Sequence, residues 1–396
     1  MIKIDNSLFD KNELLKIYGE DSKEIETIRQ SIIKKVNEND PIVIALFHNW
    51  FYENGQVSKS RISSFLMDPE PARYIVEFAE VICETIWNDK ELANSYLMWE
   101  EASKRAAKAS DIQERIKILS PLVYDKSAIM FSMQGKTILA EDLDQTKKQG
   151  TLFSNKQRIN YLRITETAKI DTVLDACRKV FDYEKFALKH RAKVLSAMHV
   201  SVCPYCNRQY ITPYRKNGKQ YTSAAIDHYF SKNRYPFLAL SLYNIVPSCS
   251  ICNSSLKGTS DFFQTPHINP HKRGFDDSAR FRIKNVEALV ARDEKPAVYL
   301  EHTDNEEVRN SIDTFCLETI YDSAHEDYIE ELIRKAKIYS DKKMQEYLEL
   351  FKELFADKEE MRQILYGNYL RKKDLGKRPL SKLTRDILMD LGICLD

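Results

Sequence analysis

Two pairs of cysteines with the same spacing carry the clearest chemical signal in this sequence. Cys203 and Cys206 form one Cys-x-x-Cys pair, and Cys249 and Cys252 form a second. Four thiolates from two such pairs can bind one zinc ion tetrahedrally, which predicts a structural Zn²⁺ site. Four unrelated buried thiols and a redox-active pair are the alternatives. The repeated spacing argues against the first alternative, and the presence of two pairs argues against the second.

Polar residues between and just after these pairs could perform hydrolytic chemistry. Asp227 and Asn253 offer a carboxylate and an amide oxygen, which are ligands suited to Mg²⁺ or Mn²⁺. His228, which follows Asp227 directly, could take a proton from water as a neutral imidazole. Lys232 and Lys257 flank the site and could hold phosphate oxygens. A base, a Lewis acid and a held phosphate are the parts that phosphodiester hydrolysis requires.

The segment between the two pairs predicts strands around a tight turn. Asn217-Gly218 is a strong signal for a two-residue hairpin turn. We predict one strand before this turn and a second strand that continues to residues 226–228. Residues 249–256 predict a short helix that Gly258 ends. Because so small a fold has little core, a structural metal would supply stability.

These residues resemble the motifs of the HNH endonucleases, whose ββα-metal core carries an Asp-His pair. The resemblance covers residues 203–271 and rests on D-H-x-x-x-K followed by C-x-x-C-N-x-x-x-K. It implies that His228 is the general base and that Asp227 and Asn253 bind the catalytic Mg²⁺ or Mn²⁺. It also implies that Asn244 braces the loop. The last motif position is Asn253 rather than the commoner His, which leaves the metal preference open.

A narrower resemblance is to HNH proteins that work beside an ATPase in bacterial anti-phage systems, such as the Septu nuclease subunit. It rests on Ser231-Lys232, Tyr235-Pro236 and Ile268-Asn269-Pro270. This resemblance implies an antiviral effector that acts on DNA with an ATPase as its partner protein.

Composition limits the class of protein. The chain has 396 residues, of which 43% are hydrophobic and 30% charged, so we expect two or three folded domains. The net charge of +1 means that any nucleic-acid surface must be local. The N-terminal sequence has no apolar signal segment, and no apolar run reaches membrane-spanning length. With cysteines spaced for metal binding, these features predict a cytoplasmic protein with no membrane partner.

We predict an α+β fold that is mostly α, with a zinc-stapled ββα-metal HNH core between helical regions. Residues 1–198 form the helical N-terminal region, and residues 199–275 form the core. Residues 276–396 contain a small strand pair, at 281–283 and 298–300, followed by helices. The scarcity of glycine, 10 residues in all, suits a largely helical chain.

Several features outside the core have two interpretations. We predict His48 to be a packed core residue of a helix over residues 41–51, and His267 and His271 to lie in a surface loop. The basic stretches at 171–199 and 371–385 either contact nucleic acid or are solvated. The apolar stripe from residues 329 to 354 either packs in the core or docks a partner or a second copy.

The sequence therefore predicts a metal-dependent endonuclease that acts on DNA. One alternative is a zinc-stabilised nucleic-acid-binding subunit without catalytic activity, and another is a nuclease directed at RNA. A third is a subunit that stays silent until a partner ATPase releases it. Since HNH cores contact the backbone with few base contacts, the motifs do not identify the sequence or the type of nucleic acid.

Overall fold

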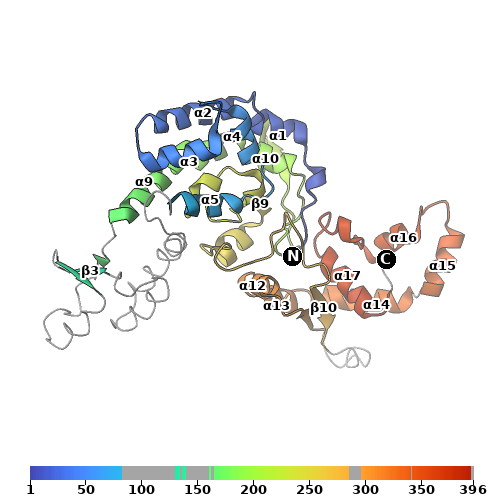
Figure 1. Ribbon diagram of the computed structural model, residues 1–396. Helices are drawn as coiled ribbons and strands as arrows, with labels where there is room; N and C mark the ends of the chain where they lie inside the picture. The colour runs from blue at the N-terminus through green and yellow to red at the C-terminus, as the bar shows by residue number, and fades with distance from the viewer. Residues whose placement is uncertain are drawn as a thin grey trace, which may run out of the picture. The chain divides into compact units, whose positions relative to one another are not determined.

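The fold is seen in a computed structural model of the chain (Figure 1). It describes residues 1–82, 130–133, 136–139, 160–161, 165–284, 296–339 and 341–393. The chain forms two compact units: residues 1–17, 184–231 and 243–396 make up the first, and residues 18–183 and 232–242 the second. Helices alternate with small sheets of two or three strands in the described part. The predicted α+β class is thus confirmed, while the predicted domain boundaries stay predictions.

The second unit is built from helices around an aromatic core. Its main elements are α2 (Lys23–Val36), α3 (Pro41–Phe51), α4 (Lys59–Leu66), α5 (Arg73–Ile82), α9 (Thr165–Val180) and η6 (Pro236–Leu238), with short strands β1 (Tyr52–Glu53), β2 (Gln56–Val57), β3 (Met130–Met133), β4 (Lys136–Leu139) and β5 (Asn160–Tyr161). Asp40 caps α3 by accepting hydrogen bonds from the backbone of Ile42 and Val43. Helix α3 contacts α2, α4, α5 and α9, so it forms the centre of this unit (Figure 1).

The prediction that His48 packs in the core is wrong. Its side chain is exposed and stacks on Tyr52, with ring centroids 3.7 Å apart. The buried positions of α3 include Leu46, Phe47 and Trp50, and the helical repeat places His48 outside the face that they form. A run that is apolar nearly throughout does not show from its letters which residue faces solvent.

The first unit contains the other helices of the described residues. Apart from the helix after the second cysteine pair, they are η1 (Asn6–Leu8), α1 (Lys11–Tyr18), α10 (Tyr183–Ala197), η7 (Leu242–Asn244), α12 (Glu306–Thr314), α13 (Leu317–Asp322), α14 (Glu326–Ile338), α15 (Asp341–Leu350), α16 (Lys358–Tyr366), η9 (Lys372–Asp374) and α17 (Ser381–Asp390). Strands β10 (Ala279–Ile283) and β11 (Val298–His302) pair antiparallel, which confirms the predicted strand pair. Helix α17 packs on β10, where Asp386 Oδ2 accepts a hydrogen bond from the Phe281 backbone over 3.0 Å (Figure 1).

The strands of the predicted core differ from the prediction in one respect. Strands β6 (Pro213–Lys216) and β7 (Lys219–Thr222) form the expected hairpin about Asn217-Gly218. The second strand does not continue to residue 228. Instead a separate strand β8 (Ala225–His228) pairs antiparallel with β9 (Ile245–Ser248). The physical reason is burial: β8 and β9 are almost wholly buried, whereas β6 is exposed throughout and so are Lys219 and Tyr221 of β7.

The helix predicted after the second cysteine pair is present. It is η8 (Ile251–Lys257), a π-helix, and it ends at Gly258, whose φ of 52° suits glycine. The Gly258 N–H donates to the Asn253 carbonyl over 3.2 Å, five residues back. Such helices are rare and often lie at functional sites.

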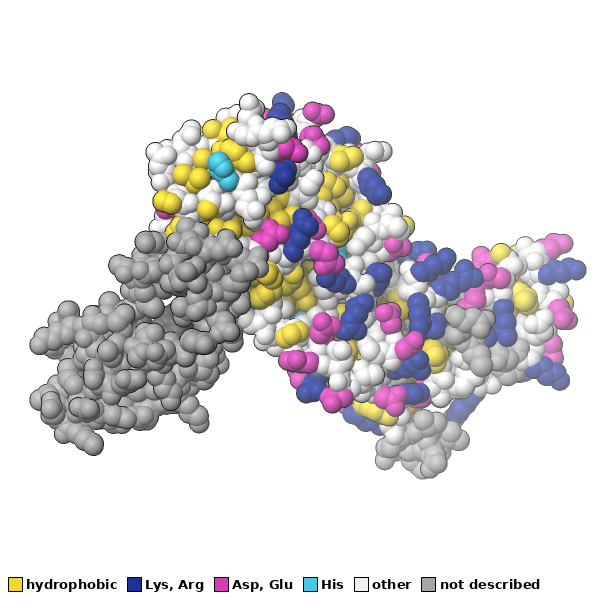
Figure 2. Space-filling view, viewed as in Figure 1, with side chains coloured by type: hydrophobic (Ala, Val, Ile, Leu, Met, Phe, Trp, Pro, Cys, Tyr) yellow, Lys and Arg dark blue, Asp and Glu magenta, His cyan; other side chains and the backbone are white. Residues whose placement is uncertain are grey.

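The basic stretch near the C-terminus is engaged within the first unit. Its ion pairs are Arg371–Asp357 at 2.6 Å and Lys372–Asp277, Lys377–Asp374 and Lys382–Asp386, each at 2.7 Å. Figure 2 shows Lys and Arg side chains interspersed with Asp and Glu over this part of the molecule. The stretch is therefore folded and partly neutralised rather than an extended basic tail. None of the described helices has the length and apolar character needed to cross a membrane.

Candidate metal centre

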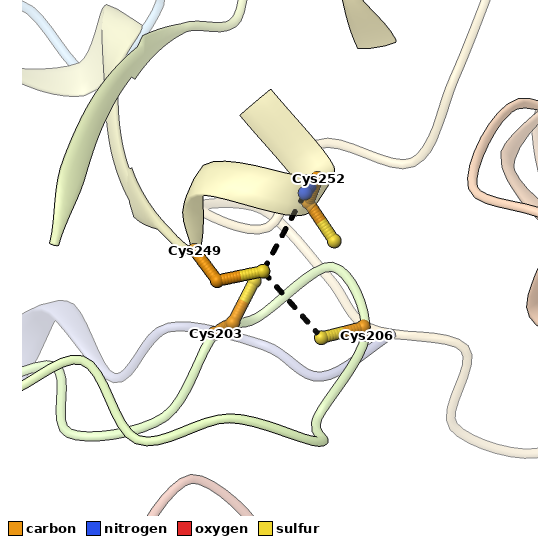
Figure 3. A group of neighbouring side chains, drawn as sticks. All are labelled: Cys203, Cys206, Cys249 and Cys252. Carbon is orange, nitrogen blue, oxygen red and sulfur yellow. Dashed lines mark hydrogen bonds between the residues drawn. The ribbon is translucent and has the colours of Figure 1, made fainter. Parts of the chain in front are cut away.

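The four cysteines of the two pairs meet at one point of the first unit. Their sulfur atoms all lie within 4.8 Å of one another, and all four residues are buried. Cys206 Sγ lies 4.0 Å from Cys249 Sγ. A tetrahedral zinc site with Zn–S bonds of about 2.3 Å places its sulfurs about 3.8 Å apart. The cluster could therefore hold a metal ion such as zinc (Figure 3).

Two local structures aim the thiols at this point. Cys203 and Cys206 lie in a loop between α10 and β6, where the Asn207 N–H donates to the Cys203 carbonyl over 2.8 Å. Cys249 and Cys252 lie where β9 ends and η8 begins, and Cys249 Sγ accepts a hydrogen bond from the Cys252 backbone over 3.5 Å (Figure 3). Each pair is thus shaped by its own turn, and the β8–β9 pairing brings the second turn to the first.

The first knuckle, residues 203–206, is also a junction for distant parts of the first unit. Tyr321 Oη donates to the Cys206 carbonyl over 2.5 Å, and the Ile2 N–H donates to the Pro204 carbonyl over 2.9 Å. The next residue, Asn207, donates its side-chain amide to the Leu375 carbonyl over 3.0 Å. The conformation of the knuckle therefore bears on the N-terminus and on the C-terminal helices.

Asp227 accepts hydrogen bonds from two buried side chains. Tyr205 Oη donates to Asp227 Oδ2 over 2.5 Å, and Lys257 Nζ lies 2.8 Å from both carboxylate oxygens. Burial, then the nearby Asp227 carboxylate, raises the pKa of Tyr205 well above its ordinary value, so the phenol keeps the proton it donates. Burial lowers the pKa of Lys257, and Asp227 opposes that shift. The three side chains form a polar cluster inside the unit.

His228 ends strand β8 next to this cluster, and Asn244 ends η7 just before strand β9. His228 is buried, with 7% of its surface exposed, and stands opposite Ile245 in the β8–β9 register. Asn244 accepts a hydrogen bond from the Phe230 backbone at Oδ1 over 2.7 Å and donates one to the Phe230 carbonyl over 3.0 Å. These bonds tie the start of β9 to the loop that follows His228.

The remaining predicted site residues are Asn253, Lys232 and Lys257. Asn253 is half-buried in η8, the helix that contacts β8. Lys232 belongs to the second unit, where its ammonium lies 4.0 Å from the centre of the Tyr183 ring. Lys257 turns its ammonium to Asp227 inside the protein. The phosphate-binding roles of Lys232 and Lys257 stay predictions.

His267 and His271 are buried, so the prediction of surface loop histidines is wrong. Each ring nitrogen has a polar neighbour: His267 Nε2 lies 2.8 Å from Thr314 Oγ1, and His271 Nε2 lies 2.8 Å from the Ile245 carbonyl. Burial lowers the pKa of both residues, that of His271 to about 4. Polar partners far away in the sequence permit this burial, and a local pattern does not reveal them.

Two important residues carry no motif of their own. Tyr205, inside the first Cys-x-x-Cys pair, has no expected role beyond the turn, yet it bonds to Asp227. Asn207 follows that pair with a φ of 52°, a conformation that Asn adopts more readily than most residues. The only sequence signal for either residue was the position of Tyr205, an aromatic residue between the two predicted metal ligands Cys203 and Cys206.

Comparison of the chain with protein-family models, with curated proteins and with solved structures finds no match. The metal cluster, the strand pair and the polar cluster around Asp227 are therefore the basis for a functional proposal.

Replacing Lys257 by methionine is expected to lower the free energy of unfolding by about 3–5 kcal/mol, because it leaves the buried Asp227 carboxylate without its cation. Urea denaturation monitored by circular dichroism would measure the change. Lys284→Met is the matched control, since it breaks an exposed ion pair with Asp322 and should cost about 1 kcal/mol or less. Equal losses in the two variants would show that the buried pair contributes no more stability than an exposed one.

Proposed function

We propose that the chain is a metal-dependent HNH endonuclease that hydrolyses phosphodiester bonds in DNA. The observation that best supports this is the order of its parts in space. Strands β8 and β9 pair antiparallel, η8 follows β9 and contacts β8, and Asp227-His228 ends β8. Two strands and a helix around a metal are what the motif resemblance implies. The cysteine cluster joins the two ends of this segment.

A hard divalent cation is compatible with the residues present. A carboxylate has about four lone-pair positions. Tyr205 and Lys257 occupy both positions on Asp227 Oδ2 and one on Oδ1. The remaining position on Oδ1 could bind Mg²⁺ or Mn²⁺, and the Asn253 amide would be a second ligand. When bound, such a cation stabilises the charge that develops on the leaving oxygen.

The side chains have separate proposed tasks. His228 takes a proton from the water whose oxygen forms the new bond to phosphorus, while the bond from phosphorus to the leaving oxygen breaks. Tyr205 and Lys257 hold the Asp227 carboxylate in one orientation. Asn244 fixes the loop after His228 through its two bonds to Phe230. The four thiolates hold Zn²⁺ and take no part in the reaction.

A finer proposal concerns biological context. By the narrower motif resemblance, the nuclease is the effector of a bacterial anti-phage system, in the cytoplasm, with an ATPase as partner. Co-elution of the chain with an ATPase found encoded beside it would support this, and cleavage that depends on the pair would make the ATPase the trigger.

One observation favours a second candidate, a zinc-stabilised nucleic-acid-binding subunit without catalysis. The Lys257 ammonium already neutralises Asp227 in a buried pair, so the carboxylate is stable without a divalent cation. This candidate expects binding of zinc alone. Titration of the zinc-loaded protein with Mn²⁺, followed by electron paramagnetic resonance, separates the two: a bound Mn²⁺ supports the nuclease.

The proposal is tested by incubating the zinc-loaded protein with supercoiled plasmid in Mg²⁺, in Mn²⁺ or without added divalent cation. We expect conversion to nicked and linear forms only with Mg²⁺ or Mn²⁺. A parallel reaction with RNA tests the RNA-directed alternative. Absence of both cleavage and Mn²⁺ binding, with the ATPase present, would contradict the nuclease assignment and leave the binding subunit.

A further inference from the structure

The β6–β7 hairpin projects side chains that the fold itself does not use. Tyr214 and Tyr221 stand opposite each other with ring centroids 5.5 Å apart, yet 51% and 41% of their surfaces are exposed. All four residues of β6 are exposed. An isolated two-stranded hairpin is marginally stable in water. Packing within the chain therefore does not explain the two exposed tyrosines.

The charges on the hairpin are also uncompensated. Arg215, Lys216 and Lys219 have no ion pair to any described residue. Lys216 and Lys219 are direct cross-strand partners, and like charges opposite each other destabilise a sheet. This contrasts with the basic stretch at 371–385, where Arg371, Lys372, Lys377 and Lys382 are in ion pairs. A local arrangement that costs stability without return inside the fold points to a function.

The surrounding sequence has the same sign of charge. From residue 185 to residue 226 the chain has no Asp or Glu, but eight Lys and Arg, in a protein whose net charge is +1. Helix α10, which supplies four of them, also holds the link between β7 and β8, because Arg191 Nη2 donates to the Ala224 carbonyl over 2.6 Å. The local field therefore attracts a polyanion.

The shape of the hairpin selects among polyanions. Tyr214, Lys216, Lys219 and Tyr221 share one face of the ribbon, and Arg215 lies on the other. The major groove of B-form DNA is about 12 Å wide and admits a two-stranded ribbon. The corresponding groove of A-form RNA is too narrow and deep for side chains to read.

The hairpin is connected to the first cysteine knuckle on one side and to strand β8 on the other. At its base, the Ser223 N–H donates to the Thr212 carbonyl over 3.0 Å. The chain before β6 pairs with the first knuckle, where the Cys203 N–H donates to the Gln209 carbonyl over 3.0 Å. On the other side, two residues separate β7 from β8, the strand that carries Asp227-His228.

We propose that the β6–β7 hairpin binds duplex DNA, with Arg215, Lys216 and Lys219 contacting phosphates and the tyrosine face lying in the major groove. The proposed purpose of this binding is to hold DNA next to β8, and in that respect the proposal rests on the endonuclease function. The binding itself can be measured without cleavage.

The test compares two triple variants in a His228→Ala background without added divalent cation. One carries Arg215→Ala, Lys216→Ala and Lys219→Ala, and the control carries Lys11→Ala, Lys23→Ala and Lys352→Ala, three exposed lysines without an ion pair among the described residues. Both triples have the same net charge. Fluorescence anisotropy with a duplex oligonucleotide, at several salt concentrations, gives the affinity and its salt dependence.

We expect the hairpin triple to bind more weakly and to lower the slope of log affinity against log salt by about three, one for each phosphate that these side chains no longer neutralise. The control triple should keep the slope of its parent. Equal effects of the two triples, or tighter binding to single-stranded DNA, RNA or polyglutamate than to duplex, would overturn the proposal. Normal binding by the hairpin triple beside metal-dependent cleavage by the unmutated protein would remove the hairpin role and keep the nuclease. Weaker binding by the hairpin triple, together with no metal-dependent cleavage by the unmutated protein, would keep the hairpin role and remove the nuclease alone.

Discussion

Replacing His228 by alanine is expected to lower the rate of metal-dependent DNA cleavage by about 10²–10⁴-fold, the usual loss when a general base is removed. The change should fall on the rate at saturating DNA, because the imidazole is proposed to act on water rather than on the DNA backbone. The measurement is the initial rate of plasmid nicking in Mn²⁺, with the affinity for duplex DNA measured in parallel.

Two further variants keep this result interpretable. Because His228 is buried at 7% exposure, alanine leaves a cavity that could lower stability. His228→Asn fills more of that volume and should lose the same activity while melting closer to the unmutated protein. His302→Ala removes an exposed imidazole from β11 and should change nothing. If His228→Ala cleaved DNA at a rate within a few-fold of that of the unmutated protein, His228 would not be the general base.

The contrast with Lys257→Met separates chemistry from stability. The lysine variant removes a cation from a buried carboxylate and should lower the free energy of unfolding. The His228 variants should lower the rate with the cysteine cluster intact. If Asp227 binds the divalent cation, Mn²⁺ should also raise the melting temperature of Lys257→Met more than that of the unmutated protein, because it would neutralise the orphaned carboxylate.

The parts of the site that the sequence predicted are those set by local chemistry. The two Cys-x-x-Cys pairs, the Asn217-Gly218 turn and the helix ended by Gly258 each depend on neighbouring residues, and the structure has all of them. The prediction of a four-cysteine cluster needed only the assumption that the two Cys-x-x-Cys pairs bind the same metal ion. The structure places their sulfurs within 4.8 Å of one another, as that assumption requires.

The parts that were not predicted depend on long-range partners. The strand with Asp227 pairs with residues 245–248 rather than with the hairpin, because a buried strand needs a buried partner. Lys257 was predicted to hold phosphate. Nothing in its local sequence indicates that its Nζ lies 2.8 Å from Asp227 Oδ1. His271 is buried because Asn6, 265 residues earlier, and Ile245 both approach its ring. These contacts exist only after the chain has folded.

Replacing Cys249 by serine is expected to lose the bound zinc and, with it, the folded state of the first unit at room temperature. Structural zinc binding is worth about 10–16 kcal/mol in small zinc domains, which is as large as the whole stability of a typical domain at about 5–15 kcal/mol. Zinc content per chain, measured by mass spectrometry, should fall from one equivalent to a small fraction. Thermal and urea unfolding should show the loss of stability.

The reason to expect so wide an effect is the position of the first knuckle. Its backbone accepts hydrogen bonds from Tyr321 and from Ile2, and Asn207 next to it holds residues of the C-terminal segment. Without metal, four buried thiols would have to share this point with little to hold them in place. Cys316→Ser, which changes an exposed thiol, should keep both zinc and stability. A Cys249→Ser protein that is zinc-free yet as stable as Cys316→Ser would show that the cluster does not hold a structural metal.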